Sequence, residues 1–133
     1  MANEQNGKLI GLAHIGVMVK DSDASLDFYT HTLGFEVQSV QDLGRTKLVF
    51  LQAGTCVIEL VPVNETEDRQ AGPVDHICLE VEDIGPFVER RKAKGVKLEK
   101  ETYSDVGLFG GIRNIFFRGP DDERIEFFDY LRK

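Results

Sequence analysis

The chain has few of the residues and segments that mark secreted or membrane-spanning proteins. Only two cysteines occur in 133 residues, and Cys56 and Cys78 form neither a C-x-x-C pair nor a disulfide framework. We therefore expect two reduced, half-buried thiols in a cytoplasmic protein. No run of about 18 apolar residues is present, so we expect no helix that spans a membrane. The polar N-terminal segment lacks the apolar centre of a signal peptide.

The chain also has too few basic residues to favour nucleic acid or a membrane surface as partner. Its 16 Lys and Arg are outnumbered by 23 Asp and Glu, which gives a net charge of −7. Such a chain repels phosphate groups and anionic lipid headgroups. A local basic cluster from Arg90 to Lys94 is interpreted as a solvated helix face. Length and composition indicate one globular domain, residues 1–133.

An internal repeat organises the sequence. The segments 14–21 and 76–83 share His, Ile, Val and Asp at an offset of 62 residues. We divide the chain into repeat one, residues 9–63, a polar linker, residues 64–73, and repeat two, residues 74–131. Each repeat begins with an extended segment, enters a helical stretch and continues with three further extended segments.

The expected helices follow the repeated segments and end at glycines. The first helix runs from Ser22 to Thr32 and places Ala24, Phe28 and Leu33 near one face. The second helix runs from Ile84 to Lys94, and Arg91 contributes only its aliphatic stem to the apolar face of that helix. The expected N-caps are Asp21 or Ser22 for the first helix and Asp83 for the second. β-branched and aromatic residues predict strands over 12–19, 35–41, 47–52, 56–63, 96–99, 111–118 and 124–130. A loop with three glycines, residues 106–111, is interpreted as a flexible connection or a lid over bound substrate. The fold class is α+β, with paired βαβββ modules, curved mixed sheets and one helix covering each half.

Residue types that bind metals fall at equivalent places in the two repeats. His14 and His76 lie on the first strand of each repeat, and Glu59 and Glu126 lie on the last. Strand alternation places apolar Ile58, Leu60, Ile125 and Phe127 on the opposite face from the two glutamates. Any one of these residues, taken alone, is explained as well by a structural histidine or a solvated glutamate. The joint pattern favours one metal ion bound by His14, Glu59, His76 and Glu126, because a glutamate with apolar neighbours is costly to desolvate without a cation.

Two histidines and two carboxylates suit a divalent ion of intermediate hardness. Ni²⁺, Co²⁺, Zn²⁺, Mn²⁺ and Fe²⁺ all suit such a site, and of these Ni²⁺ or Zn²⁺ is the expected ion. Four protein ligands leave open positions on an octahedral ion, which is typical of a catalytic centre. His31 has no repeat-equivalent partner and is expected at the surface.

The layout resembles the vicinal oxygen chelate superfamily, which includes glyoxalase I, methylmalonyl-CoA epimerase, extradiol dioxygenases and fosfomycin-resistance proteins. The resemblance covers residues 10–130 and is carried by the segments 12–17, 25–29, 33–35, 57–60, 75–77 and 119–126. It implies the glyoxalase/bleomycin resistance/dioxygenase fold and a homodimer. The ligand order His, Glu, His, Glu is most similar to that of glyoxalase I, the lactoylglutathione lyase.

That resemblance implies an enzyme acting on the hemithioacetal of methylglyoxal and a thiol, by proton transfer through a metal-bound enediolate. It assigns the proton transfer to a glutamate, Glu126 by the family pattern, with Glu59 as the other catalytic carboxylate. Glyoxalase I commonly has an arginine four residues after the first ligand histidine, where this chain has Met18. The run 75–83 also resembles methylmalonyl-CoA epimerase. Arg45, Lys47, Arg113 and Asn114 are available to bind a carboxylate or phosphate.

Two other classes remain open at this point. A binding module of this fold would sequester a small molecule without chemistry, but such proteins typically lack the metal ligands. A dioxygenase generally has two histidines and one glutamate, so the second glutamate argues against it. Residue types and spacing do not decide whether one chain closes the site or two chains share it.

Overall fold

The computed structural model describes residues 7, 10, 12–64 and 74–131. The first half contains β1 (Ile15–Val19), α1 (Ser22–Asp27) and, continuing α1, a π-helical segment, η2 (Phe28–Leu33). These are followed by β2 (Glu36–Asp42), β3 (Lys47–Ala53) and β4 (Cys56–Pro62). The four strands form one sheet in the order β1-β4-β3-β2, with β1 and β4 parallel and the other neighbours antiparallel.

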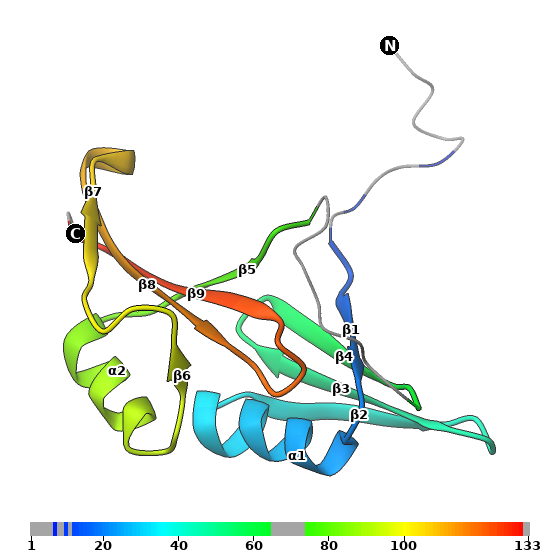
Figure 1. Ribbon diagram of the computed structural model, residues 1–133. Coiled ribbons are helices and arrows are strands. Elements are labelled where there is room, and N and C mark those ends of the chain that lie inside the picture. Colours follow the sequence, from blue (N-terminus) through cyan, green and yellow to red (C-terminus); the bar gives the residue numbers. More distant parts are fainter. Residues whose placement is uncertain (1–6, 8–9, 11, 65–73, 132–133) are drawn as a thin grey trace.

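The second half repeats this plan. It contains β5 (Ile77–Glu80), α2 (Ile84–Lys92), β6 (Lys97–Leu98), β7 (Ser104–Val106), a 3₁₀ turn, η3 (Leu108–Gly110), β8 (Ile112–Arg118) and β9 (Arg124–Tyr130). The strand order is β5-β9-β8-β6, with β7 added on β8, and β5 and β9 are again parallel. Figure 1 shows the two curved sheets with α1 and α2 packed on them. The predicted fold class of two βαβββ modules is confirmed.

Several predicted boundaries were wrong. Strand β1 begins at Ile15 rather than at residue 12, and β5 begins at Ile77, so both candidate histidines lie just before a strand instead of on it. Strand β7 was not predicted, because its short polar sequence was interpreted as part of a loop. The predicted linker falls almost entirely on residues 65–73, which lie outside the described residues.

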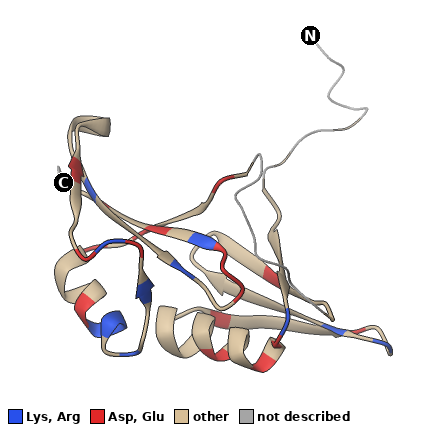
Figure 2. Ribbon diagram, in the orientation of Figure 1, with Lys and Arg blue, Asp and Glu red and all other residues tan. Residues whose placement is uncertain are grey.

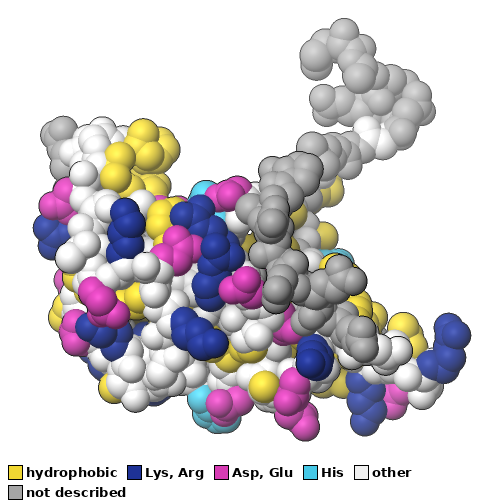
Figure 3. All heavy atoms as spheres, viewed as in Figure 1, with side chains coloured by type: hydrophobic (Ala, Val, Ile, Leu, Met, Phe, Trp, Pro, Cys, Tyr) yellow, Lys and Arg dark blue, Asp and Glu magenta, His cyan; other side chains and the backbone are white. Residues whose placement is uncertain are grey.

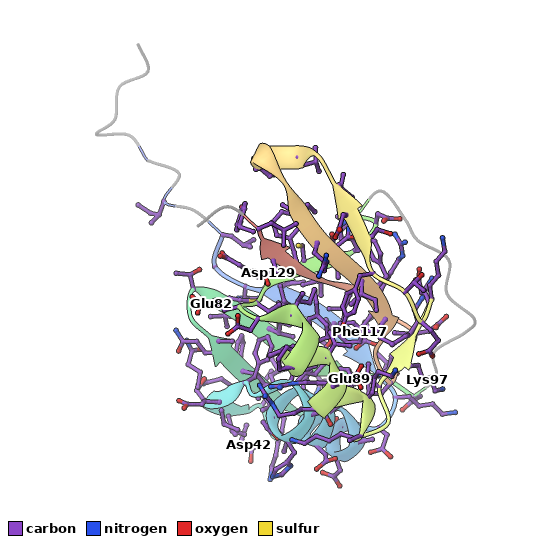
Figure 4. The ribbon with its side chains drawn as sticks, turned by 90° about the vertical axis from the view of Figure 1, so that its left-hand side faces the viewer. Asp42, Glu82, Glu89, Lys97, Phe117 and Asp129 are labelled. Atoms are coloured by element: carbon purple, nitrogen blue, oxygen red, sulfur yellow. The ribbon has the colours of Figure 1, made fainter. Side chains whose placement is uncertain are left out.

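One hydrophobic core joins the two halves. The face of each sheet that the alternation pattern predicted to be buried does supply it, including Ile58 and Leu60 from β4 and Ile125 and Phe127 from β9. Phe117 on β8 is fully buried and stacks on Phe127 with ring centroids 4.2 Å apart. Figure 4 shows Phe117 beside α2, near the middle of the molecule. The two modules therefore pack as one body, with their core faces toward each other.

The turn between β8 and β9 fastens the second half onto the start of α1. The carboxylate of Asp121, 7% exposed, accepts hydrogen bonds from the backbone N–H of Lys20, at 2.9 Å, and from the Ser25 hydroxyl, at 3.2 Å. Glu123 accepts from the Tyr29 hydroxyl at 2.8 Å. Burial and the carboxylate of Glu123 raise the pKa of Tyr29 well above its usual value, so the hydroxyl remains a donor. We call the contacts of Asp121 and Glu123 with Lys20, Ser25 and Tyr29 the clamp.

The predicted inner face of the first helix is confirmed at Phe28 and Leu33 but was wrong at Ala24, and the clamp explains the difference. Ser25 and Tyr29 are fully buried, whereas Ala24 is exposed. A serine becomes an inward residue here because a buried carboxylate from the distant turn accepts its hydrogen bond.

The basic cluster at the end of α2 also joins the halves. The Arg91 guanidinium donates to the carbonyls of Thr32 and Leu33, and Lys94 donates to the carbonyl of His31. These cations satisfy carbonyls at the C-terminal end of η2, where partial negative charge accumulates. The prediction that Arg91 contributes only its aliphatic stem was therefore wrong.

The helix caps differ between the halves. Of the two predicted candidates, Asp21 and not Ser22 caps α1, accepting from the N–H of Ala24. Asp83 makes no side-chain cap; Asp129 on β9 accepts from the N–H of Ile84 instead, and Figure 4 shows it above the first turn of α2. Among the described residues, no helix has the length and apolar character needed to cross a bilayer. Figure 2 shows acidic and basic residues interspersed over both halves.

We predict that Tyr29→Phe lowers the free energy of unfolding by about 1–3 kcal/mol, because the half-buried carboxylate of Glu123 loses a hydrogen-bond donor. Urea denaturation followed by circular dichroism measures this change. The control is Tyr130→Phe, which removes a hydroxyl outside the clamp from a partly buried tyrosine. Equal stability of the two variants would contradict an energetic role for the clamp.

Candidate metal centre

The first pair of candidate ligands comes together between β1 and β4. The Nε2 atom of His14 lies 3.1 Å from Oε1 of Glu59. In the parallel ladder Gly16 is the register partner of Glu59, and His14 stands two residues earlier on the same face. Gly16 stands next to this carboxylate, and a Cβ at the glycine would lie 3.5 Å from Glu59 Oε1, in ordinary van der Waals contact. The backbone therefore aims both side chains at one point.

The second half repeats this geometry. The Nε2 atom of His76 lies 3.0 Å from Oε1 of Glu126, and Cys78 is the register partner of Glu126. Glu126 is the more enclosed glutamate, with a side chain 9% exposed, compared with 16% for Glu59. The desolvating environment and the carboxylate of Glu126 raise the pKa of the Cys78 thiol to about 12, so this thiol stays protonated at neutral pH.

An aromatic ring supports each histidine, which sequence inspection missed. Phe50 on β3 meets the ring of His14 edge to face, with centroids 5.2 Å apart, and Phe116 on β8 meets His76 in the same way at 5.4 Å. The register explains the match, because Phe50 pairs with Glu59 and Phe116 pairs with Glu126. The repeat thus contains a His–Glu–Phe set in each half.

A chain of polar contacts orients the second pair. Asp75 Oδ2 lies 2.8 Å from Nδ1 of His76, so the other ring nitrogen, Nε2, is the one directed at Oε1 of Glu126 and would be the donor to a cation there. Hydrogen bonds from His76 and Arg124 hold the pKa of Asp75 below its usual range. Arg124 also binds Glu99 and stacks over the Phe116 ring at 3.9 Å.

Glu126 has an anchor that Glu59 does not share. The Asn114 side-chain amide donates to Oε2 of Glu126 at 2.7 Å. The position in the first half that corresponds to Asn114, two residues before the phenylalanine, is Leu48. Asn114, one of the residues proposed for binding substrate anions, therefore fixes a candidate ligand instead, and Arg113 is bound by Asp105 at 2.7 Å.

The donor atoms in each pair fit a metal ion. Two ligand atoms about 2.1 Å from one ion and at right angles to each other stand about 3.0 Å apart. The two Nε2–Oε1 distances of 3.1 and 3.0 Å are compatible with this spacing and equally with a direct hydrogen bond between each histidine and its glutamate. An imidazole with its other nitrogen held by a carboxylate, as in His76, is a common arrangement at zinc sites.

The four candidate ligands form two pairs, not one cluster, within the chain. Among the described residues, no group of three or more His, Cys, Asp and Glu side chains is close enough to hold an ion. His31 is exposed and contacts Asp27 on its own helical segment, as expected for a surface histidine. Met18 is 53% exposed on β1, on the same side of the strand as Gly16.

Comparison with known proteins gives one consistent family. The model of the Glyoxalase/Bleomycin resistance protein/Dioxygenase superfamily matches residues 11–127. An ethylmalonyl-CoA/methylmalonyl-CoA epimerase from Cereibacter sphaeroides is 33% identical over 84% of this chain and 89% of its own length. A lactoylglutathione lyase from Neisseria meningitidis is 32% identical over 87% of this chain and 88% of its own length.

Solved structures agree on the fold. The fosfomycin resistance protein FosX from Listeria monocytogenes, complexed with Mn(II) and sulfate, covers 94% of this chain and 96% of its own, with a TM-score of 0.72 and 20% identity. The predicted superfamily resemblance is confirmed. The chain belongs to the Glyoxalase/Bleomycin resistance protein/Dioxygenase superfamily.

Proposed function

We propose that the protein is a metal-dependent lyase of the glyoxalase I type, which converts a methylglyoxal–thiol hemithioacetal by moving one proton between neighbouring carbons. The observation that supports this proposal is the duplicated His–Glu pair, with Nε2–Oε1 distances that match two ligands of one ion. The lactoylglutathione lyase relative and the Mn(II) complex of FosX are consistent with it.

We further propose that the centre is shared by two chains of a homodimer. His14 and Glu59 of one chain and His76 and Glu126 of the other form the four-ligand set, because one chain presents its described ligands as separate pairs. Strands β1 and β5, which lie beside these pairs, are the terminal strands of their sheets and pair on one side only among the described residues. A two-fold dimer brings β1 of each chain to β5 of the other and forms two such centres.

The roles of the residues follow from their surroundings. A bound Ni²⁺ or Zn²⁺ supplies Lewis-acid stabilisation of charge on the substrate oxygens. Glu126 takes the proton from the carbon and returns it to the neighbouring carbon, and Asn114 fixes the orientation that this transfer requires. His14, His76 and Glu59 hold the ion, and Phe50 and Phe116 fix the imidazole rings.

A second candidate is epimerisation of a CoA thioester, which uses the same proton transfer next to a carbonyl. Two observations favour it: the epimerase relative at 33% identity, and Met18 in place of the arginine common in glyoxalase I. Turnover of methylglyoxal–glutathione adducts compared with methylmalonyl-CoA distinguishes the two activities.

We predict distinct effects of the four ligands on metal content. His14→Ala and His76→Ala each remove one donor and lose most of the bound metal, as measured by elemental mass spectrometry. Glu126→Gln keeps an oxygen donor but has no proton acceptor, so metal is partly retained while turnover falls about 10²–10⁴-fold. His31→Ala is the control and changes neither quantity. Full metal occupancy in both His→Ala variants would exclude the four-ligand centre.

Mixing the two inactive histidine variants tests whether the centre is shared. A heterodimer of His14→Ala and His76→Ala chains contains one intact centre and one with neither histidine. After equal mixing and reassociation we expect about a quarter of the wild-type centres, and activity, to return. No recovery is expected if each chain builds its own centre, so an inactive mixture of exchanged subunits would contradict the shared arrangement.

Met18→Arg tests the glutathione preference. An arginine here adds a charge-assisted contact to a substrate carboxylate, so we expect kcat/KM for the glutathione adduct to rise about tenfold over that for a neutral thiol adduct. Met18→Leu is the uncharged control. An unchanged ratio in the arginine variant would remove Met18 from the explanation of substrate choice.

A further inference from the structure

An apolar arm stands at one end of the second sheet. Strand β7, the turn η3 and the start of β8 form this arm, and Figure 1 shows it projecting beyond the rest of the sheet at the upper left. Figure 3 shows hydrophobic side chains exposed at its tip. The two apolar residues of the turn, Leu108 and Phe109, are 54% and 72% exposed. Exposed apolar side chains that stand side by side indicate a contact with another molecule.

Phe109 has a backbone conformation that is unusual for a phenylalanine. Its φ of 52° and ψ of 32° lie in the left-handed region, which favours glycine. The chain therefore holds an exposed aromatic ring at a position where glycine is the unstrained choice. Backbone strain of this kind is typical of segments that bind ligands, so the side chain of Phe109 is a candidate for such a contact.

Two aromatic residues of β9 fix the ring of Phe109. Its centroid lies 6.3 Å from that of Phe128 and 5.9 Å from that of Tyr130, and the latter two rings meet edge to face at 4.9 Å. The core that joins the two halves includes none of these three rings. We call Phe109, Phe128 and Tyr130 the aromatic wall. Its contacts hold the exposed ring of Phe109 in one place against the sheet.

The aromatic wall stands on the ligand face of the second sheet. Glu126, Phe128 and Tyr130 alternate along β9 with residues of the opposite face and so share one side of the strand. Phe128 follows Glu126 by two residues, which is about 6.8 Å along an antiparallel strand. The register partner of Phe128 is Asn114, whose amide donates to Glu126. The wall thus begins beside the carboxylate that we propose as the base and extends away from it to Phe109.

We propose that the aromatic wall binds the hydrocarbon substituent of the substrate, with Phe109 as the residue that determines specificity. The preferred substrate is then the thiol adduct of a 2-oxoaldehyde that carries an aromatic group in place of the methyl group. This inference rests on the proposed function, in which Glu126 moves a proton from the sulfur-bearing carbon to the neighbouring carbon. The substituent is attached to that neighbouring carbon and so lies within reach of Phe128.

The chemistry of the substrate decides which of its ends meets the wall. The thiol end of a glutathione adduct carries charged and amide groups, whereas the other end is a hydrocarbon. Burial of charged groups against aromatic rings is unfavourable without partners, whereas burial of a hydrocarbon is favourable in proportion to its area. A methyl group covers little of the step from Glu126 to Phe128. A phenyl group covers more of it and adds ring-to-ring contacts.

Binding of two hydroxamates tests the inference without turnover. Acetohydroxamate and benzohydroxamate both present two adjacent oxygens to a metal ion, and they differ in a methyl or a phenyl group. With the full chain loaded with Zn²⁺, we expect Phe109→Gly to weaken benzohydroxamate binding about tenfold more than acetohydroxamate binding, as measured by calorimetry. Glycine suits the left-handed conformation, so this variant is expected to remain folded by circular dichroism.

Two further variants distinguish a contact with the ligand from a structural role of the arm. Phe109→Tyr keeps the ring and is expected to restore the affinity for benzohydroxamate. Leu108→Ala removes apolar area from the same turn and is expected to leave the ratio of the two affinities unchanged. A ratio that is the same in wild type and Phe109→Gly, or that changes as much in Leu108→Ala, would overturn the inference.

Turnover gives a second measurement. For one thiol, we expect kcat/KM for the phenylglyoxal adduct to exceed that for the methylglyoxal adduct about tenfold, and Phe109→Gly to remove most of this preference. Changing the thiol at a constant substituent is expected to be insensitive to Phe109. A preference among thiols that changes in Phe109→Gly would assign the wall to the other end of the substrate and overturn the proposal.

These results separate the aromatic wall from the proposed function. A protein that binds benzohydroxamate through Phe109 but converts no adduct retains the wall and lacks the proposed activity. An active protein whose selectivity is unchanged in Phe109→Gly retains the proposed function and loses the inference. A weaker dimer in Phe109→Gly, with unchanged hydroxamate binding, would place a second copy of the chain on the wall instead. Binding of neither hydroxamate to the loaded protein would exclude both proposals.

Discussion

The clamp between the β8–β9 turn and α1 is the interaction on which the rest of the molecule depends. A carboxylate removed from water is costly unless it meets hydrogen-bond donors. The buried Asp121 and the half-buried Glu123 meet donors of Lys20, Ser25 and Tyr29 in the other half. These donors reach the two carboxylates only when the two halves adopt one relative position. The clamp thereby selects a core-to-core packing of the modules, which the cations at the end of α2 reinforce.

This packing separates the two His–Glu pairs. Each pair is fixed by the parallel ladder of its own module, β1 with β4 or β5 with β9, and so its geometry does not require the other half. Since the core faces are turned toward each other, the faces that carry the ligands belong to two different surfaces. Under the proposed function, a second copy supplies the other two candidate ligands, and a two-fold axis would form both centres with identical contacts.

The two halves have also diverged in ways that matter for chemistry. Glu126 has an amide donor in Asn114, and His76 has a carboxylate partner in Asp75, whereas the position equivalent to Asn114 in the first half is the apolar Leu48. The second pair is therefore the more rigidly held. This asymmetry is consistent with a division of roles, in which the first His–Glu pair mainly binds the metal ion and the second pair also transfers the proton.

The sequence alone determined the repeat, the strand faces and the four candidate ligands, because the period-two alternation around Glu59 and Glu126 is local information and the offset of 62 residues is visible in a single chain. It also led to the superfamily that the family match confirms. Only the tertiary structure decided which face of the first helix is buried and that Asp129 caps α2. It also decided that Arg91 donates to the Thr32 carbonyl and that Asn114 donates to the Glu126 carboxylate. Each of these features depends on a partner that is distant in the sequence. The spacing of residues along the chain does not indicate which distant group accepts a given hydrogen bond. The separation of the candidate ligands into two pairs was likewise decided by the tertiary structure. It follows from how the two modules pack together and not from the residues within either module.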